Sequence, residues 1–476
     1  MSPEDAVVMD NVFPKQSEVV TRNGCSVHCN TAEGTYTVGM LAEYKAGTQR
    51  KLIAALNGKL INVSTSSPST IGSGFSSNNW KWVNHGGKIF FVNGTDAPQD
   101  WDGTTLTATA WSGLTIANLS DVCVFKERLF FIEKNTLKFW YPASVKTLTG
   151  ALTSFDLSYV GTFGGTLQAI GKITSDGGDG VDDKIAFYLS SGEVIVYEGS
   201  DPGDATKWSL VGVFTIGAPV GAAVVKFGSD LVAITQGAYV QLTKVLPFGR
   251  TQKQSMDLSD KISGEVARMT RLYSGNTGWQ ATLYPKGRML IFNVPVSSTV
   301  FQQHVLNIDT RAWCRFTGWN FNTFCLFNDS LYAGGTDGKI YLCDSGTDDN
   351  GEEIAVDLQT AWNFFGSTDQ EKVFSMARVI MTGSVDPNAL LATGVDFEIG
   401  APTDAIEMED IGSLGAIWGE AEWGVGEWSG AVRTLKGWNG IAGQGYCLSL
   451  RITMSLSVQA VTIQAYNVIM SKAGPL

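Results

Sequence analysis

Between residues 50 and 345 the chain alternates short apolar runs with polar turns that contain glycine. The stretch LIAALNGKLINV shows the pattern first, with Asn57-Gly58 between two apolar runs. Asn-Gly in this position is a strong signal for a β-hairpin, because both central residues of a type I′ turn need a positive φ. The segment is therefore predicted to form two antiparallel strands joined by a tight turn.

The same pattern returns six more times, in WKWVNHGGKIFFVNG, VCVFKERLFFIE, AFYLSSGEVIVYEG, AVVKFGSDLVAIT, ATLYPKGRMLIFNV and LYAGGTDGKIYLC. So many similar hairpins in one unbroken stretch indicate radial repetition of small antiparallel sheets. A β-propeller blade takes about 40–50 residues, so this region predicts a propeller of about six or seven blades. A series of β-sandwiches is the alternative.

The remaining segments predict a second β domain and a short arm. The acidic stretch CDSGTDDNGEEIAVD (343–357) indicates a boundary, and five strand-like segments follow it. The fold class is therefore all-β, a propeller plus a second β-sandwich-like domain. The expected domains are an N-terminal arm with edge strands (1–45), a β-propeller (46–350) and a C-terminal β domain (351–476).

One stretch breaks the all-β pattern. In LSDKISGEVARMTRLY, Ile262, Val266, Met269 and Tyr273 recur at helical spacing after a capping residue at Ser259 or Asp260. We expect a helix here that crosses between blades.

Charge narrows the functional classes. The net charge of -12 argues against a protein that grips nucleic acid through its phosphates, which requires clustered Lys and Arg. An acidic wall past which DNA slides stays compatible with it, because such a wall repels phosphates. The start of the chain lacks a basic leader, and no apolar run reaches the ~20 residues of a membrane span, so neither secretion nor a membrane anchor is expected. Seven scattered cysteines suit reduced thiols in a cytoplasm.

Catalytic motifs are absent from the sequence. The three histidines, His28, His85 and His304, are isolated from one another along the chain. No nucleophile elbow, H-E-x-x-H, P-loop or dinucleotide fingerprint occurs. We expect no catalytic residue and no cofactor.

Two segments carry ligand-type residues for metals. Cys25, His28 and Cys29 offer three zinc-type ligands without a second pair nearby. A cluster of oxygen donors that calcium prefers lies at Asp176, Asp179, Asp182 and Asp183, without the glutamate that closes a Ca²⁺ loop. The expected metal content is none.

Three tryptophans recur every five residues in AIWGEAEWGVGEWSG, at Trp418, Trp423 and Trp428. Neither a helix nor a strand keeps residues at that interval on one face, so glycine-rich turns between the rings are expected. The rings either fill the core of the C-terminal domain or, with Arg433, form interface anchors of the kind that Trp and Arg often provide.

Several ordered stretches resemble the tail nozzle (tail hub) proteins of short-tailed bacteriophages, also described as head-closure or packaged-DNA-stabilising proteins. They are YEGSDPGDATKWSLVGVFTIGAPVGAAVVKFGSDLVAITQGAYVQLTK (197–244), GWQATLYPKGRMLIFNVPVSSTVFQQHVLNIDTRAWCRFTGW and LYAGGTDGKIYLCDSGTDDNGEEI. The opening PEDAVVMDNVFPKQSEVVTRNG is similar to the family's N-terminal arm, with its turn at Arg22-Asn23-Gly24.

The resemblance implies a structural virion protein of mechanical role. Several copies would form a homo-oligomeric ring, a hexamer by analogy with the family, below the portal and adaptor and beside tail fibres or tailspikes. The ring would close the portal-adaptor channel to retain packaged double-stranded DNA and conduct it during ejection. The protein would be assembled in the host cytoplasm and reside in the virion tail.

The N-terminal arm leaves a choice open. Val12 and Phe13 either fold back as an edge strand or reach across to a neighbouring copy as an exchanged strand. Together with Arg22 they are the interface candidates of this segment.

Two other functions remain alternatives. A carbohydrate-binding or glycan-cleaving propeller, such as a tail-associated depolymerase or lectin, would carry exposed aromatics beside paired carboxylates at the propeller mouth. A host-encoded adhesion or scaffold propeller would be favoured by a secretion signal.

Overall fold

The computed structural model describes residues 5–174, 183–245, 257–384, 386–406, 409–411 and 433–473. The chain divides into two compact units. We call one the sandwich unit, which consists of Met1–Ser26, His304–Trp319 and Cys343–Leu476. The other is the propeller unit, which consists of Val27–Gln303 and Asn320–Leu342.

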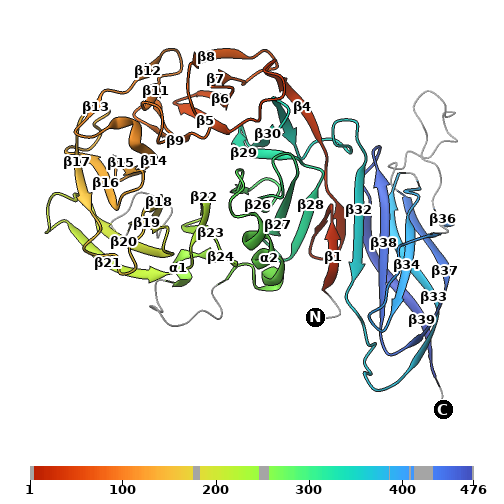
Figure 1. Ribbon diagram of the computed structural model, residues 1–476. Coiled ribbons are helices and arrows are strands. Elements are labelled where there is room, and N and C mark those ends of the chain that lie inside the picture. Colours follow the sequence, from red (N-terminus) through yellow and green to blue (C-terminus); the bar gives the residue numbers. More distant parts are fainter. Residues whose placement is uncertain are drawn as a thin grey trace. The chain divides into compact units, whose positions relative to one another are not determined.

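The propeller unit consists of consecutive small antiparallel sheets, or blades, which Figure 1 shows following one another around a ring. The first blade contains β5 (Met40–Ala46), β6 (Gln49–Leu56), β7 (Lys59–Asn62) and β8 (Ser69–Ser73). The second contains β9 (Lys81–His85), β10 (Lys88–Val92), β11 (Gln99–Trp101) and β12 (Leu106–Ala108). The third contains β13 (Trp111–Ser112), β14 (Leu119–Phe125), β15 (Arg128–Glu133), β16 (Lys138–Pro142) and β17 (Gly150–Asp156), with the 3-10 turn η1 (Ile116–Asn118) before β14.

The remaining blades complete the ring. The fourth contains β18 (Leu167–Ile173), β19 (Lys184–Leu189), β20 (Glu193–Gly199) and β21 (Trp208–Thr215). The fifth contains β22 (Pro219–Phe227), β23 (Asp230–Thr235) and β24 (Ala238–Gln241), and the sixth contains β25 (Gln280–Tyr284), β26 (Met289–Pro295) and the beginning of β27 (Phe301–Asn307). The seventh contains β29 (Phe321–Phe327), β30 (Ser330–Gly335), β31 (Lys339–Cys343) and β4 (Cys25–Asn30).

The innermost strands of neighbouring blades contact one another all the way round. The contacts run from β5 through β9, β14, β18, β22, β25 and β29, and β29 in turn contacts β5. In the last blade, β4 is the outermost strand although it precedes the first blade in sequence. The described part of the unit is therefore a closed propeller of seven blades, which confirms the fold predicted from the hairpin series.

Each of the seven predicted hairpins forms, one in every blade. The φ angles of Asn57 and Gly58 are 50° and 65°, the left-handed values that a type I′ turn needs. Lys126 and Glu127 adopt the same left-handed conformation without glycine, at 46° and 58°. Local turn chemistry therefore located the hairpins correctly.

Every blade packs on both of its faces. Along β15, Phe130 and Ile132 belong to one hydrophobic cluster, whereas Leu129 and Phe131 belong to the next. Because successive strand residues point to opposite faces, the strand is apolar throughout rather than alternating. This burial explains why the hairpins appear in the sequence as continuous apolar runs.

The predicted helix is present as η3 (Asp260–Ile262) and α2 (Ser263–Tyr273), after the short α1 (Leu242–Val245). Val266, Met269 and Thr270 are its buried residues. The helix contacts β24 and β26, so it lies between the fifth and sixth blades as expected.

The sandwich unit consists of two sheets. One has the order β28 (Trp313–Thr317), β1 (Ala6–Asp10), β32 (Ile354–Thr360), β38 (Leu448–Leu456), β34 (Leu390–Val395) and β35 (Asp404–Ala405). The other has the order β2 (Val12–Pro14), β3 (Val19–Thr21), β39 (Thr462–Lys472), β33 (Lys372–Gly383), β37 (Arg433–Gly445) and β36 (Glu409–Ile411). A shared core with Val356, Val379 and Leu450 lies between them, which is the packing of a β-sandwich.

The division of the chain differs from the linear one expected from the sequence. Residues 1–26 do not form a separate arm, because β1 pairs with β32 and β3 pairs with β39. Residues 27–45 begin the propeller unit instead. The expected boundaries at residues 45 and 350 are thus wrong in detail, because strand pairing joins segments that lie far apart in sequence.

Side chains connect the inner strands of neighbouring blades where no shared backbone ladder does. The Gln280 side chain donates from Nε2 to the carbonyl oxygen of Phe324 and accepts from the Phe324 N–H at Oε1, both at 2.8 Å. Asn84 does the same between the second and first blades, through Glu43 O at 2.8 Å and Lys45 N–H at 3.0 Å. These amides replace one rung of a β-ladder between blades.

Replacing Gln280 by alanine should destabilise the propeller unit by about 1–3 kcal/mol, because it leaves the half-buried N–H and carbonyl of Phe324 without these partners. Urea denaturation checks the value. As a matched control, the exposed Gln168, whose Nε2 donates to Thr166 Oγ1 two residues away, should tolerate alanine within about 0.5 kcal/mol. Equal effects of the two variants would contradict the proposed connection.

Candidate functional site

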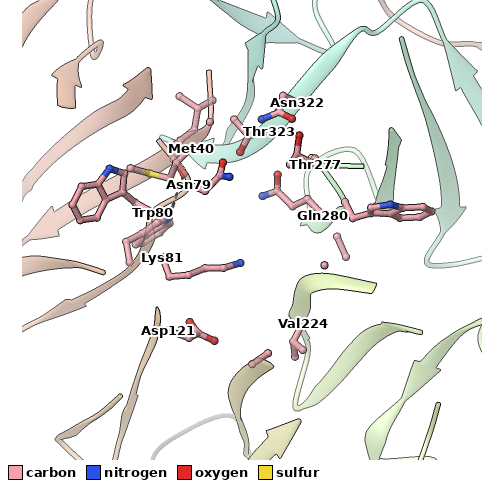
Figure 2. A pocket seen from close by; sticks show the side chains of 18 of the residues that line it. Met40, Asn79, Trp80, Lys81, Asp121, Val224, Thr277, Gln280, Asn322 and Thr323 are labelled. Atoms are coloured by element: carbon pink, nitrogen blue, oxygen red, sulfur yellow. Dashed lines mark hydrogen bonds between the residues drawn. The ribbon is translucent and has the colours of Figure 1, made fainter. Parts of the chain in front are cut away.

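One candidate site is a cavity of about 610 Å³ at the centre of the propeller unit. All seven blades contribute to its lining, including the loop 274–279 that precedes β25. Figure 2 shows the amino end of Lys81 directed into the open centre, with Asp121 on one side and Asn79 and Gln280 on the other. Met40, Trp80, Val224, Thr277, Asn322 and Thr323 complete the labelled lining.

Asp121 is the charged group that the fold holds most tightly in this cavity. Its carboxylate accepts the N–H of Val122 at 2.8 Å and that of Ile170, on the next blade, at 3.1 Å. Burial raises the pKa of the Asp121 carboxyl, whereas Lys81 and the two N–H donors lower it. The carboxylate therefore bridges the third and fourth blades and is oriented by main-chain donors.

The amide side chains of the lining are likewise held in place. Asn322 donates from Nδ2 to the carbonyl oxygen of Val38 at 2.8 Å, and Gln280 is bound to Phe324 as described above. The indoles of Trp82 and Trp279 are fixed too, since Trp82 donates to Leu41 O and Trp279 donates to Tyr273 O. Several polar groups of the wall are thus already engaged in hydrogen bonds, some of them between blades.

The reactions that the cavity could catalyse are limited by the small number of carboxylates in its lining. Among the described lining residues Asp121 is the single acid. A glycan-cleaving site needs two carboxyl groups that share the work of acid and nucleophile or base. The lining offers hydrogen bonds and one ammonium group to a small polar molecule, without that pair.

Val12 and Phe13 do not present an interface in the structure. Both are buried, and Val12 belongs to the core of the sandwich unit. Their strand β2 pairs with β3 at the edge of its sheet, so the arm folds back on its own chain. Of the two arrangements expected for the arm, the fold-back is the one observed, because these apolar side chains complete the core.

Arg22 is likewise internal to the chain, and an interface role for it stays a prediction. Its guanidinium makes two bonds to the Asp349 carboxylate, one of them at 2.8 Å, and its Nε donates to Asn11 Oδ1 at 2.8 Å. The remaining N–H groups donate to the carbonyl oxygens of Asn23 and Thr317. All five guanidinium donors are therefore used, and the plane lies 4.9 Å from the centre of the Trp319 ring.

The structure does not test the prediction made for the three tryptophans. Trp418, Trp423 and Trp428 lie outside the described residues. Arg433 is the first residue of β37 and pairs with Gly383 of β33, and its side chain is half-buried. An interface role for these four residues stays a prediction.

The zinc-type residues of β4 do not converge. His28 lies 3.1 Å from the carbonyl oxygen of Val63 through Nε2, whereas Cys29 is buried in an apolar cluster. Successive strand residues point to opposite faces, which separates the two. Burial, together with the neighbouring Asp349, raises the pKa of the Cys25 thiol to about 12. All seven cysteines carry free thiols.

The other metal candidate lies mostly outside the described residues. Only Asp183 of the four aspartates is described, and it is buried. In the described part of the chain, no cluster of three or more His, Cys, Asp and Glu side chains could hold a metal ion. Nor does any described helix combine the length and apolar character needed to span a membrane.

Sequence reasoning missed every residue of the cavity. Lys81 and Asp121 occur in ordinary strand segments with no motif around them. A polar residue at the inner end of an apolar strand is the only signal that could have identified them, and it becomes meaningful only once the blade order is known.

The variant Asp121→Asn tests whether the pKa of the buried Asp121 carboxyl is raised in the folded chain. Because the pKa of Asp121 is raised above its ordinary 3.8, the folded chain keeps this proton at pH values where the unfolded chain has lost it. The contribution of Asp121 to stability is thus complete below about pH 3.8 and is lost as the pH rises through the folded pKa. The unfolding free energy of the wild type minus that of the variant should fall across this window in urea titrations at several pH values. A constant or rising difference would contradict the shift.

Arg22→Met should destabilise the sandwich unit by about 3–5 kcal/mol, because it leaves the largely buried Asp349 carboxylate uncompensated. Lys15→Met, in the same unit, breaks a solvent-exposed pair with Glu18 and should cost less than about 1 kcal/mol. Hydrogen exchange of strands β32 and β39 measures both. Similar protection losses in the two variants would show that Arg22 does not secure the arm.

No family model and no curated protein matches the chain. Among solved structures the chain is similar to the computationally designed Ika8 protein, with 11% identity, a TM-score of 0.39 and coverage of 71% of this chain and 96% of that chain. It is also similar to BBS1N in complex with ARL6DN, with 10% identity, a TM-score of 0.42 and coverage of 68% and 98% respectively.

A third similar structure is the extracellular domain of the hybrid two component system BT4673 from B. thetaiotaomicron. It has 12% identity and a TM-score of 0.42, and the match covers 74% of this chain and 43% of that chain. Likenesses this distant give no information on function.

Proposed function

We propose that this chain is a structural virion protein, the tail nozzle of a short-tailed bacteriophage. Copies of it would form a ring, a hexamer by analogy with the family, that closes the portal-adaptor channel, retains the packaged DNA and conducts it during ejection. The observation that carries the proposal is the order of the resembling stretches, which run from the N-terminal arm through residues 197–244 and 278–319 to residue 354.

The fold is compatible with a mechanical role. The resembling stretches supply strands to both compact units, including the arm strands β1 to β3 and blade strands β20 to β26. A closed ring of blades and a sandwich with a shared core resist deformation because each sheet is packed on its apolar faces. A net charge of -12 would keep passing DNA from adhering to the walls.

The glycan-cleaving alternative has less support. Its expected site combines exposed aromatics with paired carboxylates, whereas the lining of the central cavity includes the single carboxylate of Asp121, bound by two main-chain N–H groups. The fixed position of that carboxylate suits a connection between blades better than proton transfer.

Immunogold electron microscopy of purified virions with an antibody against this chain tests the proposal. We expect gold at the distal end of the axial tail tube, at a number of copies per particle that fits one closed ring. Label on lateral appendages would favour a fibre or depolymerase. Unlabelled particles, with the protein free in the lysate, would refute a structural role in the virion.

A further inference from the structure

Three segments of the sandwich unit present aromatic side chains at the surface. The ring of Phe397 lies 5.1 Å from that of Trp362 and 6.4 Å from that of Phe364, between ring centroids. Phe397 is 66% exposed and the nearby Tyr446 is 44% exposed. We call Trp362, Phe364, Phe397 and Tyr446 the aromatic cluster.

The backbone beneath Phe397 is strained. Val395 and Glu398 exchange both main-chain hydrogen bonds at 3.0 Å, so Asp396 and Phe397 form a two-residue hairpin turn. Their φ angles are 50° and 71°. Such a turn favours glycine at its second position, and a bulky residue there is a conformational outlier. A ring that strains the backbone and stays mostly in solvent is not explained by the stability of the fold.

The cluster is held rigidly from below by a buried lysine. Lys372 is 3% exposed, and its Nζ donates to the carbonyl oxygens of Ser367 and Gln370 at 2.7 Å and of Tyr446 at 3.0 Å. These bonds tie the loop that carries Trp362 and Phe364 to the turn that carries Tyr446.

A carboxylate ties the third segment to the same turn. Asp396 Oδ1 accepts the N–H groups of Tyr446 and Cys447 at 2.8 and 3.1 Å. The four rings are therefore presented by three segments that are linked to one another, and little ordering is left to be done when a partner binds.

The charged residues of the two loops that carry Trp362, Phe364 and Phe397 have one sign. Residues 361–371 and 395–400 contain Asp369, Glu371, Asp396 and Glu398 and no lysine or arginine. Asp369, Asp396 and Glu398 are exposed. The ammonium group nearest in sequence, that of Lys372, is buried under three carbonyl oxygens and does not offset them. The surface is thus apolar and aromatic at its centre and acidic around it.

We propose that the aromatic cluster is a docking site for a segment of a partner protein that presents an arginine beside an apolar side chain. A guanidinium packs on aromatic faces and forms paired hydrogen bonds with carboxylates, so both parts of this surface favour it. The negative potential selects a basic partner over a second copy of this chain, whose net charge is -12. The proposal does not depend on the proposed virion function.

Fluorescence polarisation with the full-length chain tests this site. The probe is a fluorescein-labelled peptide of sequence Gly-Ser-Leu-Arg-Phe-Gly-Ser, compared with the same peptide carrying Glu in place of Arg. We expect the Arg peptide to bind at least about ten-fold more tightly, and added salt to weaken it several-fold. A chitin oligosaccharide serves as the competing probe for a glycan site.

Phe397→Gly separates binding from folding. Glycine accepts the positive φ, so the variant should melt at or above the wild-type temperature while binding of the Arg peptide falls at least about ten-fold. Phe163→Ala removes a similarly exposed ring from the propeller unit, where Phe163 is 63% exposed, and should leave binding unchanged.

Three results would overturn the proposal. The first is that the Arg and Glu peptides bind equally well, or that neither binds. The second is that the Phe397→Gly variant binds the Arg peptide as tightly as the wild type does. The third is that the oligosaccharide binds and the peptide does not. A lower melting temperature of Phe397→Gly would show that the ring serves the fold instead.

Discussion

Each blade of the propeller unit is apolar on both faces, so it is stable only between two neighbours. Phe130 and Ile132 of β15 pack on one side of their blade, and Leu129 and Phe131 pack on the other. A row of such blades has two uncovered ends, and closing the ring removes both. The position of β4 in the last blade follows from this requirement, because a strand from before the first blade then joins the two ends of the row.

Closure brings the inner strands together without a shared backbone ladder, and polar side chains supply the missing bonds. Gln280, Asn84, Asn322 and Asp121 each reach the main chain of an adjacent blade. The same residues, or their neighbours, form the wall of the central cavity. The polar character of that cavity is therefore a consequence of how the blades are joined, and its chemistry should be interpreted with this structural role in view.

In the sandwich unit, one arginine is buried and fully hydrogen-bonded, whereas one phenylalanine is mostly exposed. All five guanidinium N–H groups of Arg22 donate hydrogen bonds inside the unit, to Asp349 and to neighbouring oxygens. These bonds hold the N-terminal strands in place. Phe397 instead stays mostly exposed on a strained turn. Only the second kind of residue is exposed and therefore available to a partner.

The sequence by itself determined the hairpins, the helix α2 and the all-β class. These features depend on interactions between residues close in the chain, such as the left-handed turn at Asn57-Gly58 and the helical spacing of Val266 and Met269. The tertiary structure alone decided the division into units and the surroundings of Val12, Phe13 and Arg22. Arg22 meets Asp349 across 327 positions and Val461 meets Thr21 across 440, and no local pattern encodes such pairings. The cavity and the aromatic cluster arise in the same way, because each gathers side chains from several strands or loops whose proximity exists only after the sheets have packed.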